Sequence, residues 1–145
     1  MNWEKQDFPA NWPLARQIAE PHAPEFDKLK SESFDPAALW QRVNGDRQLL
    51  VELVELFMQE CPRLLQKLRS SIEQGSFTDI QKFSHKLKGS ALQFSGRGAA
   101  SAAGALEDAA KGKSLQEAER LFAKLSEEIT HLMPLLRSMV FRPSP

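Results

Sequence analysis

Apolar residues recur at three- and four-residue steps along most of this chain, and that spacing restricts its fold more than any other feature. Between residues 46 and 74 the apolar residues in phase are Leu49, Leu50, Leu53, Leu56, Phe57, Leu64, Leu65, Leu68 and Ile72. Such a spacing places side chains on one face of an α-helix. No stretch alternates apolar and polar residues with the β-branched enrichment of a strand. The sequence therefore predicts an all-α fold.

Capping and turn residues divide this pattern into separate helices. Asp35 can cap backbone amides and Pro36 suits a first helical position, which predicts a short helix from there to about Val43. The next helix is expected from Asp46 to about Gln74, with a bend at Pro62 and an end at Gly75. Two more helices are expected over 77–94 and 99–110, separated by the turn 95–98. Ser114 and Glu117 resemble a capping box that opens a last helix reaching about Met139.

Four substantial helices joined by short turns predict an antiparallel four-helix bundle with a short additional N-terminal helix. We assign this bundle to residues 34–140, because 145 residues suffice for one domain with an apolar core. Residues 1–33 contain Pro9, Pro13, Pro21 and Pro24 and are expected to form an irregular N-terminal arm. Residues 141–145 are expected to form a C-terminal tail.

The composition limits the classes of function. With 19 basic and 19 acidic side chains the formal charge is zero, so no overall field attracts nucleic acid or an anionic membrane. Cys61 is the single cysteine, which excludes an intramolecular disulfide and a zinc-binding thiol pair. The chain begins without a signal-peptide pattern and contains no apolar run of membrane-spanning length. We expect a soluble, cytoplasmic monomer without a metal site.

His85 stands out on the helix expected over 77–94. At about 100° per residue, the core-facing stripe of this helix consists of Ile80, Phe83, Leu87, Ala91 and Phe94. His85 lies roughly 150° from the centre of that stripe, and Gly89 follows one turn later. The pattern predicts an exposed imidazole with empty space beside it. A neutral imidazole is nucleophilic near neutral pH.

Gly89 and three lysines surround this histidine. A mid-helix glycine costs about 1 kcal/mol relative to alanine, so Gly89 serves either access to His85 or close contact with another helix. Lys88 lies on the adjacent turn, and Lys82 and Lys86 flank the same polar surface, where their charges could attract a phosphoryl group. Taken singly, these residues are also what an ordinary solvated helix face carries. His22 and His131 lack such a context, and we assign them ordinary surface roles.

Together, Ser84-His85-Lys86-Leu87-Lys88-Gly89-Ser90-Ala91 resembles the signature of the histidine phosphotransfer (HPt) family, in which a small residue precedes the histidine and Leu-Lys-Gly follows after one variable position. The resemblance extends over about residues 34–139. It includes Phe34-Asp35-Pro36, the turn 44–46, the helix leading to Pro62, and Leu106-Glu107. One departure is that Ser95 stands where the family usually has glycine, with Gly96 one place later. The geometry of that turn is therefore left open.

The resemblance implies site residues. It implies that His85 accepts the phosphoryl group, that Lys88 assists and that Gly89 keeps the site open. The family often holds the second imidazole nitrogen with Gln or Glu on a neighbouring helix, and Glu107 lies at that spacing; the alternative is a solvated Glu107. A carboxylate that accepts Nδ1–H would leave Nε2 as the nucleophile. The residues expected to contact a partner are Lys82, Lys86, Leu92, Ser95 and Gly96, although Leu92 could instead be buried against another helix.

The resemblance also implies a function. The protein would relay a phosphoryl group between receiver-domain aspartates in a two-component phosphorelay, with response-regulator receiver domains and a hybrid sensor histidine kinase as partners. It would be a phosphorelay intermediate and not an enzyme, without an ATP site or cofactor of its own, because Mg²⁺ is expected on the receiver. Two alternatives stay open: a phospho-accepting fragment of a larger hybrid or chemotaxis-type histidine kinase, and a bundle that binds receivers without being phosphorylated.

Overall fold

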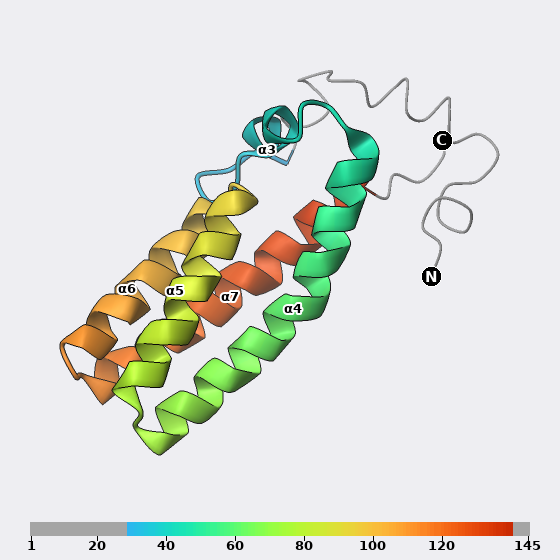
Figure 1. Cartoon of the computed structure of the whole chain (residues 1–145). Helices are drawn as coiled ribbons and strands as arrows, with labels where there is room; N and C mark the ends of the chain where they lie inside the picture. The colour runs from blue at the N-terminus through green and yellow to red at the C-terminus, as the bar shows by residue number, and fades with distance from the viewer. Residues whose placement is uncertain (1–28, 141–145) are drawn as a thin grey trace.

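A computed structural model describes residues 29–140 of the chain (Figure 1). The described residues form five helices and no strand: α3 (Pro36–Arg42), α4 (Arg47–Gln74), α5 (Phe77–Gln93), α6 (Arg97–Lys111) and α7 (Leu115–Val140). This confirms the all-α prediction. None of these helices is long and apolar enough to cross a lipid bilayer. The expectations for residues 1–28 and for the tail 141–145 lie outside the described residues.

The four long helices run in alternate directions along a common axis, and α3 lies at the end where α5 gives way to α6 (Figure 1). Helix α4 packs against α5 and α7, and α6 packs against the same two helices, with the α5–α6 contact the most extensive. Hydrogen bonds tie the segment around α3 to the α5–α6 turn, since the backbone N–H of Asp35 donates to the Ser95 carbonyl at 3.1 Å. The α5–α6 pair is therefore closely packed and anchored at one end.

The helix ends follow the capping residues in the sequence. The carboxylate of Asp35 accepts a hydrogen bond from the N–H of Ala38 at 3.2 Å, and Asp46 caps α4 through the N–H of Leu49 at 3.0 Å. Gly75 ends α4 in the left-handed conformation with φ 69°, which glycine adopts without steric cost. The helix continues past Pro62.

One expected helix start was misplaced, and the expected cap of the last helix is only partly formed. Helix α6 begins at Arg97 and not at Ala99, because the chain needs only Ser95 and Gly96 to leave α5 before helical hydrogen bonding resumes. The capping box before α7 is half formed. The Ser114 hydroxyl accepts a hydrogen bond from the N–H of Glu117 at 3.3 Å, but the Glu117 carboxylate pairs with the side chain of Arg120 instead of returning to Ser114.

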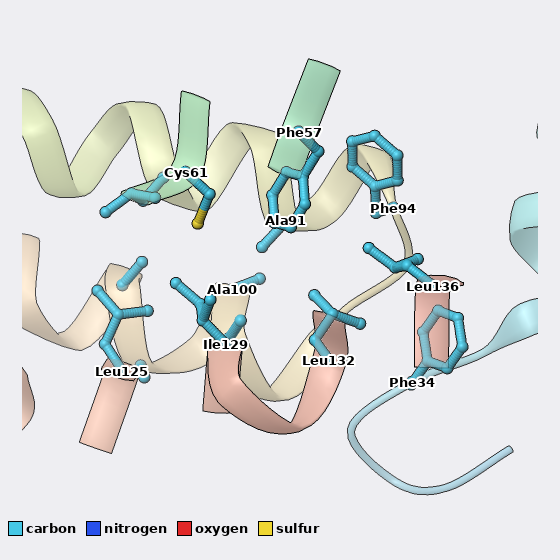
Figure 2. Packing of buried hydrophobic residues seen from close by; sticks show 14 of the residues in the cluster. Phe34, Phe57, Cys61, Ala91, Phe94, Ala100, Leu125, Ile129, Leu132 and Leu136 are labelled. Atoms are coloured by element: carbon cyan, nitrogen blue, oxygen red, sulfur yellow. The ribbon is translucent and has the colours of Figure 1, made fainter. Parts of the chain in front are cut away.

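The core lies between the four long helices, and Figure 2 shows side chains from all of them pointing toward one another. The rings of Phe57 on α4 and Phe94 at the end of α5 are 4.7 Å apart at their centroids. Helix α6 contributes small buried side chains, namely Ala99, Ala100, Ala102, Ala103 and Ala110. Alanines let backbones approach closely, which fits the close packing of α6 against α5.

The buried face of α5 is rotated slightly from the stripe that periodicity predicts. Ile80, Leu87, Ala91 and Phe94 are buried as expected. Phe83 is only half-buried, whereas Ser84 is fully buried and its hydroxyl donates to the Ile80 carbonyl at 2.6 Å. A polar side chain can be buried here because its own helix satisfies it. The rotation turns the next residue, His85, toward α6.

Candidate functional site

His85 lies on the outer surface of α5 and leans toward α6. Its side chain is 67% exposed, which agrees with the position expected from helical periodicity. Its Nδ1 atom lies 3.1 Å from Oε2 of Glu107 on α6. An ionised carboxylate can only accept a hydrogen bond, so Nδ1 carries the proton in this pair. In the neutral imidazole, Nε2 then holds the free lone pair.

Glu107 joins three cationic or potentially cationic side chains. Its side chain is only 9% exposed, and Oε1 lies 3.4 Å from Nζ of Lys88 while Oε2 lies 3.9 Å from Nζ of Lys111. Burial by itself would raise the pKa of Glu107. The hydrogen bond and charge of Lys88, together with His85 and Lys111, outweigh this effect and hold the pKa of Glu107 below its ordinary value. Glu107 is therefore ionised at neutral pH.

The two oxygens of this carboxylate have different partners on α5. One contacts the imidazole of His85, and the other contacts the ammonium group of Lys88. Because the buried carboxylate is itself fixed on α6, it orients the ring and the ammonium group together. This arrangement presents a ring nitrogen with a free lone pair and an adjacent positive charge to solvent.

Two glycines leave the space that this arrangement needs. A Cβ atom built on Gly89 would meet no heavy atom within 4 Å, so the surface beside His85 is open. A Cβ atom on Gly104 of α6 would lie 3.3 Å from Cδ of Lys88. The aliphatic stem of Lys88 therefore reaches Glu107 across Gly104. Nothing packs against Gly89, which excludes the alternative that it permits close helix contact.

Sequence reasoning missed Lys111 and Gly104. Both could have been found by helical spacing once Glu107 was placed, because Lys111 follows it by four residues and Gly104 precedes it by three. The signal is weak without the partner helix, since lysines and glycines occur at such spacings on many solvated helices. Only the packing of α5 on α6 shows that Lys88 crosses Gly104.

An open hollow of about 490 Å³ adjoins His85. Its walls come from α5 and α6 and consist of Thr78, Gln81, Lys82, His85, Lys86 and Glu107. Lys82 and Lys86 are exposed, and no wall residue is a large apolar one. A hollow that is open to solvent and has two lysines in its wall suits an anionic group such as a phosphoryl group.

The residues expected to contact a partner divide into two groups. Lys82, Lys86 and Leu92 are at the surface, and Leu92 is 49% exposed, so its burial against another helix was the wrong alternative. Ser95 and Gly96 are buried, which corrects their assignment to the partner-facing surface. Gly96 lies close to Leu132 of α7, and the Ser95 carbonyl accepts the N–H of Asp35.

The α5–α6 turn shows why a glycine would suit the position of Ser95. Ser95 has a φ of 57°, which lies in the left-handed region that glycine adopts without steric cost and that strains a serine. A Cβ atom on the following Gly96 would lie 2.7 Å from Cδ2 of Leu132, so this position does require glycine. Both residues shape the turn. Of the other histidines, His131 is exposed on α7, and His22 lies outside the described residues.

Comparison with known proteins agrees with this geometry. The family model of the Hpt domain matches residues 52–134, which is more than half of the chain and includes His85, Lys88 and Glu107. No curated protein and no solved structure matches the chain significantly. The chain therefore belongs to the Hpt domain family, whose members act as phosphotransfer intermediates in two-component signalling.

Proposed function

We propose that this protein carries a phosphoryl group on Nε2 of His85 and exchanges it with the aspartates of receiver domains. The observation that supports the proposal most directly is the pairing of an exposed imidazole with a buried, ionised carboxylate through Nδ1. The open surface at Gly89 gives a partner access to the same imidazole.

The transfer needs no proton movement. The Nε2 lone pair attacks the phosphorus of an aspartyl phosphate, the N–P bond forms, and the P–O bond breaks so that aspartate leaves as a carboxylate. The ring keeps its Nδ1 proton and becomes positively charged, which Glu107 stabilises from 3.1 Å. Transfer to a second receiver reverses these steps. Lys88 offsets the negative charge of the phosphoryl group.

The partners would be response-regulator receiver domains and a hybrid sensor histidine kinase. The receiver would supply the acceptor aspartate and Mg²⁺, while this protein would supply the imidazole and the charges around it. The same chemistry at His85 would operate if the domain is part of a larger kinase. The alternative is a domain that only binds receivers and occludes them, which would need no nucleophile. A labelling experiment distinguishes this role from the relay.

Label transfer from phosphorylated receivers tests the proposal. A panel of ³²P-labelled receiver domains with Mg²⁺ is mixed with wild type, with His85→Gln and with His131→Gln, a matched control because both histidines are exposed. We expect label on wild type and His131→Gln and none on His85→Gln, with all three folded by circular dichroism. The phosphoramidate should be lost in mild acid and persist in base.

Three results would contradict the relay. Label that persists on His85→Gln would place the acceptor elsewhere, and acid-stable label would indicate serine or threonine. Binding of receivers without any label on wild type would favour the occluding bundle.

A further inference from the structure

The surface charge of α4 changes sign near Pro62. Before this residue the exposed charged side chains include Glu52 and Glu60, whereas after it they include Arg63, Lys67 and Arg69. Arg69 is compensated by Glu73, with Nε 3.6 Å from a carboxylate oxygen. Within residues 29–140, neither Arg63 nor Lys67 has a carboxylate at ion-pair distance. The C-terminal half of α4 therefore carries uncompensated positive charge.

Phe83 connects this half of α4 to the site on α5. The ring is half-buried between the two helices, with Nζ of Lys67 5.8 Å from its centroid and Nζ of Lys82 at 5.5 Å. Attraction between an ammonium group and an aromatic face holds both lysines near the ring. Lys82 also lines the hollow beside His85, as does Lys86. We call the basic surface the group formed by Lys67, Lys82, Lys86 and Arg63, which lies one helical turn before Lys67 on α4.

The basic surface concentrates like charge in a chain whose formal charge is zero. Among the described residues, none of its four cations forms an ion pair, while Lys124 on α7 is paired with Glu128 at 3.2 Å. Uncompensated like charges repel one another, and an acidic partner that covers them removes this repulsion. Lys82 and Lys86 belong both to the hollow beside His85 and to the basic surface. A partner bound at His85 would therefore also cover the basic surface.

We propose that the basic surface binds the acidic face of a phosphorylated receiver domain and steers its phosphoaspartate toward His85. Lys67 and Arg63 extend the contact from α5 across to α4. The acidic N-terminal half of α4 repels the same face, so the reversal of charge near Pro62 sets the direction in which the receiver docks. The proposal rests on the proposed function for the identity of the partner.

The test measures how transfer depends on receiver concentration. Single-turnover transfer from a labelled receiver to the full chain is followed at low and high salt for wild type, Lys67→Glu and Lys113→Glu. Lys113 is a matched control, since it is an exposed lysine on the α6–α7 turn. Lys67→Glu should raise the receiver concentration for half-maximal rate at least threefold at low salt. This effect should shrink at high salt because exposed charges are screened. Lys113→Glu should behave as wild type.

Several outcomes overturn the proposal. If Lys67→Glu and Lys113→Glu needed the same receiver concentration for half-maximal rate, α4 would not belong to the docking surface. If Lys67→Glu lowered only the rate at saturating receiver, Lys67 would act in the transfer step instead of in docking. Lys67-dependent binding to vesicles containing phosphatidylserine, with receiver transfer unaffected, would assign the surface to a membrane. If wild type bound receivers through Lys67 but accepted no label, the relay would fail while this docking surface would stand.

Discussion

Replacing Gly89 with alanine should stabilise the protein, although glycine stands at the centre of its candidate site. A Cβ atom at this position meets nothing within 4 Å, so the new methyl group adds no clash and buries little surface. What remains is helix propensity, which favours alanine over glycine by about 1 kcal/mol in a helix interior. For a domain of this size, that gain corresponds to a rise in melting temperature of about 4 °C.

Two other glycines give a graded comparison. In Gly104→Ala the methyl group would lie 3.3 Å from Cδ of Lys88, a flexible stem that can shift by a few tenths of an ångström, so the gain in stability should be smaller. In Gly96→Ala it would lie 2.7 Å from Cδ2 of Leu132 in the core, so this variant should be less stable than wild type. Urea unfolding followed by circular dichroism ranks the three variants.

Function should change in the opposite direction at Gly89. The exposed helix should accept Gly89→Gln without loss of stability, but the longer side chain would occupy the space beside the imidazole of His85 and slow phosphotransfer severely. Gln93→Ala, an uncharged change at an exposed position one turn further along α5, controls for a changed surface side chain. A lower unfolding midpoint for Gly89→Ala, or undiminished transfer by Gly89→Gln, would refute the reasoning that this glycine exists for access.

Further predictions concern the charges and the thiol around this site. Lys88→Ala should change the free energy of unfolding by less than about 1 kcal/mol, because the ion pair with Glu107 is partly exposed. It should transfer phosphate more slowly than wild type, and this difference in rate should shrink as salt rises. Equal transfer rates at low salt would exclude a role of Lys88 in transfer. Because the folded state lowers the pKa of Glu107, its ionisation stabilises the fold above the ordinary carboxyl pKa, and this contribution is lost as pH falls through the lowered value. The stability difference between wild type and Glu107→Gln should therefore shrink in acid, and a constant difference in urea titrations would contradict it. Gly104→Met should displace Lys88 and slow transfer in the wild-type background but not in Lys88→Ala, whereas equal losses in both backgrounds would point to a general structural effect. Burial raises the pKa of the Cys61 thiol to about 12, so iodoacetamide should label it only in urea; rapid labelling of the native protein would show that α4 and α5 open there.

Local sequence signals were sufficient for most of the secondary structure. Asp35, Asp46 and Gly75 mark helix ends because a cap acts on the backbone within a few residues. The start of α6 was misplaced because the turn before it is shorter than expected. Ser95 helps to complete this turn by adopting a left-handed conformation that serine does not favour. Its neighbours impose that conformation, since its carbonyl accepts the N–H of Asp35 from a distant segment.

The sequence by itself determined that the chain is helical, that His85 faces outward, and that Lys88 and Gly89 lie near it, because each of these follows from periodicity along one helix. Only the tertiary structure decided what the imidazole contacts. Glu107 lies 22 residues away on another helix, and whether it is solvated or holds Nδ1 depends on how closely α6 packs on α5. That distance is set by the buried alanines of α6 and by Gly104, which leave room for Lys88 to reach the same carboxylate. Such packing depends on both surfaces at once, so no periodicity within a single helix can encode it.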